Sequence, residues 1–332
     1  MREMIFIGLV AVLIGLGVFI RYRLRRPSRQ YEGPASVSDV YDHWTQERIL
    51  EYYWGDHLHA GYYGDPPIKK NFIAAKVDMI DEMVKWGIAE AAPAFMRRLE
   101  QTAESAPAEK IKILDVGCGI GGSTRHLAKR WRRTTEVTGI TISKAQVERA
   151  TLLAKEQKVE NTTFLECDAL KMGFADASFD IVWAVESEPH MPDKEIFVRE
   201  MVRVLKPGGV LVIAAWNVRD TRGAPLSKAE AAHVKLLVDE WSHASFIAIH
   251  EYVEYFKKYG LVEVKADDWS AATQPTWKHA VTVALRDPRG MIQAMPYQIW
   301  RLVRDAYTIL RYDAAFRTGL CQYGLLRGRK PD

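Results

Sequence analysis

The stretch that most constrains the fold is residues 111–122, which read Ile-Lys-Ile-Leu-Asp-Val-Gly-Cys-Gly-Ile-Gly-Gly. Its apolar first half predicts a buried parallel strand. Glycines then dominate the second half, and residues 123–127 predict the start of a helix. A strand, a glycine turn and a helix in this order form a nucleotide pocket in α/β proteins, because glycine lets a ligand lie against bare backbone. The stretch therefore predicts an α/β fold with a nucleotide-binding turn.

The kind of nucleotide depends on Asp115, which lies two residues before the first glycine. Gly117, Gly119 and Gly122 match the pattern G-x-G-x-x-G, which alone is a weak sign of a dinucleotide. A carboxylate at the turn would repel a pyrophosphate and attract the α-ammonium group of S-adenosylmethionine. A dinucleotide site also needs an acidic residue at the end of the second strand, and the strand expected at 136–141 ends without one. Asp115 therefore favours S-adenosylmethionine, with a dinucleotide and a purely structural turn as alternatives.

Composition limits the class of partner and the chemistry of the cysteines. The chain has 332 residues and a net charge of +4, and its basic residues form no long tract, which argues against a nucleic-acid partner. Cys118, Cys167 and Cys321 have no metal-binding or redox spacing, so we expect reduced thiols. His57 and His59 are close in sequence, but no clear further ligands accompany them, and we expect no metal site.

An apolar run at 4–20 carries no charged or strongly polar residue. As a helix it would span about 25 Å, at the short end of the transmembrane range. Arginines follow at once between residues 21 and 29, and the positive-inside rule then places the rest of the chain on the cytoplasmic side. A cleaved signal peptide and an interfacial helix are the alternatives. We therefore expect a membrane-anchored protein held by a single N-terminal helix.

The rest of the chain alternates between strand and helix patterns after residue 111, which predicts a parallel sheet. Residues 270–318 depart from this alternation, and their helical spacing predicts either an ordinary amphipathic helix or a substrate lid. Strands are expected at 111–116, 136–141, 162–166, 179–185, 210–216, 261–267 and 321–327. The expected segments are an anchor and basic stop at 1–26, a linker at 27–38, a helical cap at 39–110 starting after Ser38, a cofactor-binding core at 111–217, and a C-terminal part at 218–332 with the lid at about 270–318.

Three features together resemble one family: Asp115-x-Gly117-x-Gly119-x-Gly121, Asp168 after the third strand, and the turn Leu-Lys-Pro-Gly-Gly at 205–209. This set resembles the class I S-adenosylmethionine-dependent methyltransferases over about 110–217. The resemblance implies a Rossmann-like α/β fold with a seven-stranded, mostly parallel sheet, helices on both faces, an N-terminal helical cap and a C-terminal helical lid. It implies cofactor contacts at Asp115, Gly117, Gly119, Gly121, Thr141, Ile142, Gln146, Asp168 and Ala169.

The segment 137–146 is similar to the branch that contains tocopherol, sterol and cyclopropane-fatty-acid methyltransferases. In that branch the positions of Thr141 and Gln146 help to hold the ribose in place of the usual acid. Motifs at 41–45, 49–57, 61–67 and 190–194, together with the N-terminal run, more closely resemble the cyanobacterial family that methylates prenylated benzoquinols. One departure from that family is Glu188, which stands where relatives usually carry a small residue.

This narrower resemblance implies ring C-methylation of 2-methyl-6-phytyl-1,4-benzoquinol or its solanesyl counterpart, in tocopherol and plastoquinone biosynthesis. The implied substrate is a lipophilic quinol, and the implied location is a plasma or thylakoid membrane of a photosynthetic cell, with the catalytic domain on the cytoplasmic or stromal side. Tocopherol O-methylation, C-methylation of sterols or other lipids, and N-methylation of an amine are the alternatives. A dinucleotide oxidoreductase and a binding protein with an inactive core are the other function classes. Asp115 and the absence of an acid at the end of the second strand count against the oxidoreductase, and the presence of Asp115 and of every glycine counts against the inactive core.

The chemistry of methyl transfer points to the loop after the fourth strand. A methyl group on a sulfonium is already electrophilic, so the protein has to align it with the acceptor and remove a proton. His190 is the first candidate for the general base because its reference pKa is near neutrality, with a loop hydrogen bond or a cofactor contact as the alternative; Glu186 is the second candidate, as a base or an orienting group. Such a reaction needs no metal. The expected substrate contacts are Tyr41, Trp54, His57 and Trp277.

Overall fold

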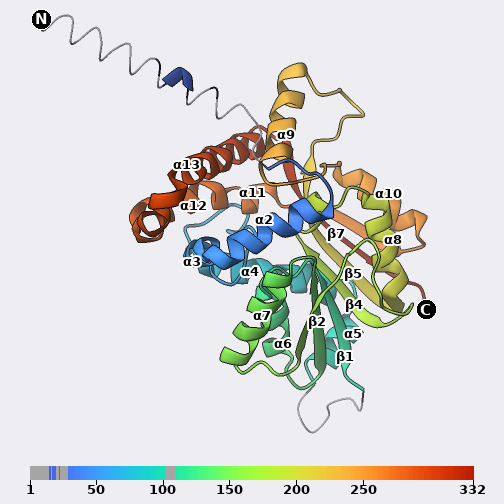
Figure 1. The fold of residues 1–332 in the computed structure, drawn as a ribbon. Coiled ribbons are helices and arrows are strands. Elements are labelled where there is room, and N and C mark those ends of the chain that lie inside the picture. The colour runs from blue at the N-terminus through green and yellow to red at the C-terminus, as the bar shows by residue number, and fades with distance from the viewer. Residues whose placement is uncertain (1–14, 16, 20–21, 23–28, 102–108) are drawn as a thin grey trace, which may run out of the picture.

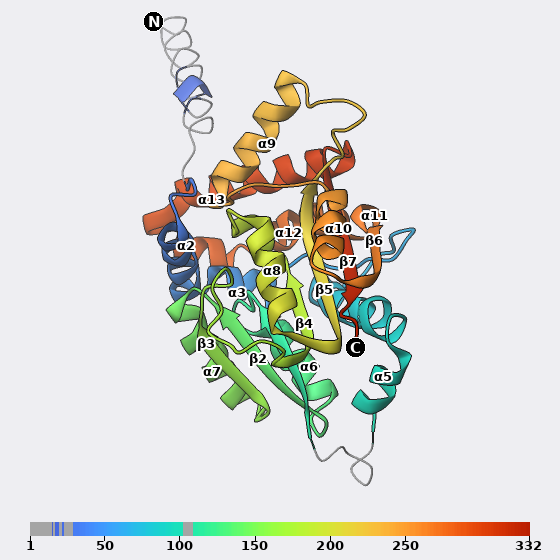
Figure 2. The ribbon, with the colours of Figure 1, turned by 90° about the vertical axis from the view of Figure 1, so that its right-hand side faces the viewer.

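The computed structural model describes residues 15, 17–19, 22, 29–101 and 109–332, and of residues 291 and 293–299 it describes the backbone alone. A seven-stranded sheet forms its centre, in the order β3-β2-β1-β4-β5-β7-β6 (Figures 1 and 2). Neighbouring strands are parallel except for β7, which runs antiparallel to β5 and β6. The strands are β1 (Ile111–Val116), β2 (Thr135–Thr141), β3 (Thr162–Glu166), β4 (Phe179–Val185), β5 (Leu205–Val218), β6 (Val262–Asp268) and β7 (Cys321–Arg329).

The predicted strands and the predicted class I methyltransferase sheet are therefore confirmed. The last strand returns after the helical segment and inserts between β5 and β6, so that Trp216 pairs with Tyr323. The strand order reverses between β1 and β4, which is the position where open α/β sheets bind their ligands.

Hydrophobic clusters cover both faces of the sheet, which explains why the central strands read as continuous apolar runs. On one face Ile113 and Val212 lie in a cluster with side chains of α4, η1, α5 and α6. On the other face Leu114 and Val182 lie in a cluster with side chains of α8 and α10. The helices concerned are α4 (Phe72–Val84), the π-helical turn η1 (Lys85–Ala89), α5 (Pro93–Leu99), α6 (Gly122–Arg130), α7 (Lys144–Glu156) beside β2 and β3, α8 (Lys194–Val204) and α10 (Ile249–Lys258).

The helical cap differs from its prediction at its N-terminal end. Its first helix, α2 (Pro34–Glu47), begins before Ser38, because the fixed φ of proline suits the first helical position. Ser38 therefore lies inside the helix, where its hydroxyl donates to the carbonyl of Ile142 at 3.2 Å instead of capping. Later in the cap the chain leaves η1 and a new helix, α5, begins at Pro93, since a proline ring suits the first turn of a helix and not its interior. A short helix, α3 (Ile49–Trp54), continues the cap after α2.

The segment predicted as a lid forms three helices instead of one. They are α11 (Ser270–Thr273), α12 (Pro275–Arg286) and the long α13 (Arg289–Arg317), and a further helix, α9 (Lys228–Glu240), precedes them. Both α12 and α13 contact α3, so segments from the two ends of the chain meet at one end of the sheet (Figures 1 and 2).

The membrane anchor predicted at 4–20 falls outside the described residues, apart from residues 15 and 17–19. Within the described ranges, no helix combines the length and the apolar character that crossing a bilayer requires. This finding overturns the predicted localisation by a single N-terminal membrane-spanning helix, and the fold class is corrected by removing that element.

Candidate functional site

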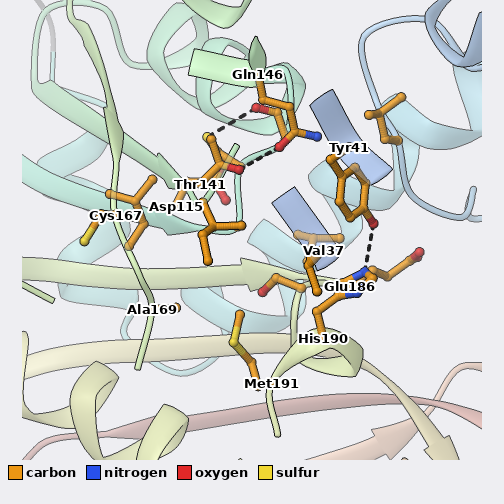
Figure 3. Close-up of a pocket in the computed structure, with 18 of the residues that line it drawn as sticks. Val37, Tyr41, Asp115, Thr141, Gln146, Cys167, Ala169, Glu186, His190 and Met191 are labelled. Atoms are coloured by element: carbon orange, nitrogen blue, oxygen red, sulfur yellow. Dashed lines mark hydrogen bonds between the residues drawn. The ribbon is translucent and has the colours of Figure 1, made fainter. Parts of the chain in front are cut away.

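Two neighbouring cavities lie at the carboxyl ends of β1, β2 and β4, beneath α2 and α3. The first is lined by the glycine turn and the ends of β2 and β3, and Figure 3 shows how its side chains converge. Of the predicted cofactor residues, those that line it are Asp115, Gly117, Gly119, Thr141, Ile142, Gln146, Asp168 and Ala169. Gly121 does not line it; with φ +78° it precedes α6, and a Cβ there would lie 2.6 Å from the ring of Phe164.

The turn needs glycine because other segments press against it. Gly117 has φ +78°, and a Cβ on it would lie 2.2 Å from the Cβ of Ser187, in the loop after β4. A Cβ on Gly122 would lie 2.1 Å from the carbonyl oxygen of Asp56, between α3 and α4. The turn is therefore wedged between the loop after β4 and the cap, and its backbone faces the first cavity.

Asp115 supplies the fixed negative charge of the first cavity. Its side chain is almost wholly buried, at 1% exposure, and its Oδ2 accepts a hydrogen bond from the Thr124 hydroxyl at 2.7 Å. Burial raises the pKa of the Asp115 carboxyl to about 6, because the ionised form has lost its water. A cation bound beside it would restore the ionised form.

Another part of the first cavity's wall is a polar pair that joins the end of β2 to α7. The Thr141 hydroxyl donates to Oε1 of Gln146 at 2.6 Å, as the dashed line in Figure 3 shows. This bond directs the amide nitrogen of Gln146 toward Gly119. Ser143 caps α7 and also donates to Asp42 of α2, which joins the cap to this wall. Asp168 lines the cavity, and its Oδ1 accepts from the backbone N–H of Leu170 at 2.8 Å.

The second cavity is larger, with about 1430 Å³ of empty space, part of it open to solvent. It is lined mainly by aromatic and aliphatic side chains of α2, α3, α12 and α13, with Trp216 of β5. The predicted substrate residues Tyr41, Trp54 and Trp277 line it. His57 does not; it lines the first cavity instead.

The two cavities share one wall, made of Tyr41, Leu58, His59, Glu186 and His190. A group in one cavity can therefore meet a group in the other only past these side chains. Three of them, His59, Glu186 and His190, are candidates for a general base, and their burial and hydrogen bonds decide which is available.

His190 is held neutral with both ring nitrogens engaged. Its Nδ1 lies 3.0 Å from the backbone carbonyl of Ser242, which can only accept, so Nδ1 carries the hydrogen. Burial lowers the pKa of His190 to about 4, so Nε2 is bare and accepts from the Tyr41 hydroxyl at 2.8 Å (Figure 3). His59 is similar: burial lowers its pKa to about 4, its Nδ1 donates to the Ala60 carbonyl at 2.8 Å, and its Nε2 accepts from His57.

Glu186 differs from both histidines. Its Oε1 accepts from the backbone N–H of Ala60 at 2.7 Å and from the Tyr323 hydroxyl at 2.7 Å, and neither bond uses Oε2. Burial raises the pKa of Glu186 to about 7, which suits a general base at neutral pH. Its backbone has φ +54°, a strained conformation for a residue with a side chain. With this backbone conformation, the Glu186 side chain, on the first residue after β4, lies where the two cavities meet.

Glu188 does not reach either cavity. It is fully buried, and its Oε1 accepts from the backbone N–H of Trp216 at 2.6 Å. Burial raises the pKa of Glu188 to about 8. Lys194 donates to the carbonyls of Glu188 and Met191, so these buried groups fix the loop that carries Glu186 and His190.

Sequence reasoning missed Leu58, His59, Ala60 and Tyr323. The first three lie in the segment between α3 and α4, whose sequence shows no clear helix or strand pattern. Tyr323 reaches the site only because β7 pairs with β5. Through the described parts of the chain, no group of three or more His, Cys, Asp or Glu side chains is arranged to hold a metal ion. All three cysteines are free thiols.

Comparison with known proteins adds to this geometry. The methyltransferase domain family matches residues 114–213. The chain is 43% identical over 302 residues to the 2-methyl-6-phytyl-1,4-hydroquinone methyltransferase of Synechocystis sp., covering 90% of this chain and 89% of that protein. It is 31% identical to the chloroplastic tocopherol O-methyltransferase of Arabidopsis thaliana, covering 85% and 79% of the two chains. The geranyl diphosphate C-methyltransferase of Streptomyces coelicolor, solved with Mg²⁺, geranyl diphosphate and S-adenosyl-L-homocysteine, shares the fold with a TM-score of 0.63 at 18% identity, over 92% of this chain and 100% of that one.

Proposed function

This chain belongs to the family of S-adenosylmethionine-dependent methyltransferases that contains the prenylhydroquinone and tocopherol enzymes, and from this premise we propose that it methylates a ring carbon of a prenylated benzoquinol. The substrates we propose are 2-methyl-6-phytyl-1,4-benzoquinol and its solanesyl counterpart. The family, the enzyme class and the methyl donor predicted from the sequence are confirmed by the comparisons. The observation that carries the proposal is the wall around Glu186, where a polar cavity and a large apolar cavity meet.

The first cavity fits the methyl donor by the chemistry of its lining. We propose that Asp115 pairs with the α-ammonium group, that Gln146 and Thr141 hold the ribose, and that Asp168 accepts from the adenine amino group. The buried carboxylate of Asp115 suits a cation, and the amide nitrogen of Gln146 provides donors beside the glycine turn. Ile142 and Ala169 provide apolar contacts for the adenine between these polar groups.

We propose Glu186 as the general base in preference to His190. Nε2 of His190 already accepts a hydrogen bond from Tyr41, and Nε2 of His59 accepts one from His57. Both hydrogen bonds that hold the Glu186 carboxylate go to its Oε1 atom, so neither of them occupies Oε2. A pKa of about 7 makes Glu186 partly ionised at neutral pH and able to take a phenolic proton. The Tyr41–His190 pair then acts as an orienting group for the quinol.

The reaction follows from this placement. S-adenosylmethionine supplies, when bound, an electrophilic methyl group on a sulfonium. Glu186 removes the proton of a quinol hydroxyl, which raises electron density at the neighbouring ring carbon. The new carbon–carbon bond forms at that carbon as the bond between the methyl group and the sulfonium sulfur breaks, leaving a neutral thioether on the donor. The ring hydrogen at that carbon then leaves as the proton released by the reaction, and Glu186 returns its proton to the ring oxygen, which restores the aromatic quinol. The shared wall excludes water and holds donor and acceptor in line, which supplies the orientation that methyl transfer needs.

The test is incubation of the purified protein with isotopically labelled methyl donor and a panel of quinols, followed by identification of the product by mass spectrometry and NMR. The expected product carries one new methyl group on a ring carbon. A methyl ether would assign tocopherol-type O-methylation instead. Absence of transfer to any quinol, with transfer to a sterol or fatty acid, would overturn the proposal.

A further inference from the structure

The second cavity continues well beyond the wall where the ring would react. Thr276 and Leu285 line it near the two ends of α12, and between them the lining residues are Trp277, Ala280, Val281 and Ala284. Their spacing of three, four and seven residues places them on one face of the helix, over about 10 Å along its axis. The cavity therefore runs along α12 for about that length.

The opposite wall runs along α13 in the reverse direction. Its apolar lining residues Ile309, Ala306 and Leu302 again lie on one helix face and span about 10 Å. Arg301 and Asp305 of the same helix, which form an ion pair with each other, also line the cavity. The inner end is fixed by aromatic contacts: Trp277 lies 5.4 Å from Trp216, measured between ring centroids, and stacks on Tyr312 at 4.9 Å. The outer end reaches solvent at Leu285, which lines the cavity and is 70% exposed.

The third wall is α3, which contributes Leu50, Tyr53 and Trp54. The Tyr53 hydroxyl donates to the carbonyl of Asp287, just after α12, at 2.8 Å. A Cβ on Gly290, at the start of α13, would lie within 3 Å of Tyr52 and Tyr53. These contacts hold the three helices together around the cavity, so its width depends on the side chains that line it.

We propose that the part of the second cavity between α3, α12 and α13 is a channel for the prenyl tail. The channel binds the isoprenoid units nearest the ring. The inference rests on the proposed function and specifies its tail subsite. An isoprenoid unit has four bonds of roughly 1.5 Å along the chain, about 6 Å of contour length, and its zigzag shortens the extended unit to about 5 Å. A channel of about 10 Å therefore holds about two units, and longer tails pass out beside Leu285. Ala280 and Ala284 leave the space that the tail occupies.

The first experiment compares quinols that differ only in tail: none, prenyl, geranyl, phytyl and solanesyl. The value of kcat/KM should rise at each step up to geranyl, by roughly tenfold or more per unit buried, and then change little. A continued rise from geranyl to solanesyl, or no rise at all among quinols that are methylated, would overturn the channel. Absence of activity with every quinol would instead overturn the proposed function, so the two failures are distinct.

The second experiment narrows the channel. Ala284→Phe adds a ring at the outer half, and Ala280→Phe adds one nearer Trp277. Both should raise the KM for phytyl quinol at least tenfold, while the affinity for S-adenosylmethionine and the kcat/KM of the tailless quinol stay near wild type. Lys278→Phe is the matched control, because Lys278 is exposed and does not line the cavity. If Ala280→Phe fails to fold, as a thermal unfolding scan would show, Ala284→Phe and the tail series still decide.

Discussion

The two cavities that meet at Glu186 are built in different ways. The walls of the first are a backbone turn, a buried carboxylate and a hydrogen-bonded Thr–Gln pair, all within the strand ends of the sheet. The walls of the second are helices that contribute tryptophan, tyrosine and aliphatic side chains. A charged nucleotide needs each of its fixed polar partners, whereas an apolar tail gains from total buried area. Substitutions should therefore act sharply at the first cavity and by degrees at the second.

The sharpest expected effect is from Gly117→Ala. The new Cβ would lie 2.2 Å from the Cβ of Ser187, and the residue would have to keep φ +78°. Strain and overpacking of about 1–3 kcal/mol each should weaken S-adenosylmethionine binding roughly 100-fold or more, measured by isothermal titration calorimetry. Gly173→Ala is the matched control, because a Cβ there meets nothing within 4 Å. Near-normal binding by Gly117→Ala would show that the turn can relax and that the contrast between the cavities is weaker than proposed.

At the shared wall, Glu186→Gln should separate chemistry from binding. The amide keeps the shape of the side chain but cannot take a proton, so kcat should fall by roughly 10²–10⁴ while affinity for S-adenosylmethionine is kept. His190→Gln should lower kcat less, because its ring nitrogens are engaged by Ser242 and Tyr41. Rapid-quench measurement of the methyl-transfer step would compare the two. A larger loss in the histidine variant would restore His190 as the base.

A smaller effect is expected from Asp115→Asn, which removes one charge and keeps an acceptor for the Thr124 hydroxyl. Loss of a charge-assisted contact worth about 1.5–3 kcal/mol should weaken donor binding roughly 10- to 150-fold. In the wild type, affinity should fall as pH drops below the Asp115 pKa of about 6, because the carboxyl must lose its proton to pair with a cation. Titrations across pH would show whether the variant loses this dependence. A variant that keeps the wild-type pH dependence would remove Asp115 from the ammonium site.

The two cavities also differ in how well the sequence predicts them. The strand, the glycine turn and Asp115 lie within twelve consecutive residues, and local rules for strands and turns place them correctly. Gly121 fitted the same pattern, yet its role in the structure is to let Phe164 approach α6. The local sequence pattern therefore identified the turn. It did not distinguish the glycines that line the cavity from Gly121, which packs against another part of the protein.

The second cavity depends on contacts that no local pattern contains. Glu186 and Tyr323 are separated by 137 residues and meet only through the pairing of β7 with β5. His57 and His59 lie two residues apart and share a hydrogen bond, yet only His59 lines both cavities. The proposed base, Glu186, also differs from the first candidate of the sequence analysis, His190. The reason lies outside the sequence, because burial and a backbone carbonyl fix the tautomer of His190.

The smallest effect, and the finest test of the comparison, is expected from Tyr323→Phe. The Tyr323 hydroxyl donates to Glu186 and lowers the pKa of its carboxyl, against the larger effect of burial that raises it. Without that bond the pKa should rise above about 7, so the acid limb of the kcat/KM profile should move to higher pH. If the pKa rises by about one unit, the ionised fraction of Glu186 at pH 7 falls from about one half to about one eleventh, so the rate should fall roughly fivefold there and recover in alkaline buffer. A merely structural role would lower the rate equally at all pH values, because lost packing does not depend on the protonation of Glu186. Recovery at high pH would therefore show that a residue of the distant β7 strand controls the proton acceptor at the wall where the two cavities meet.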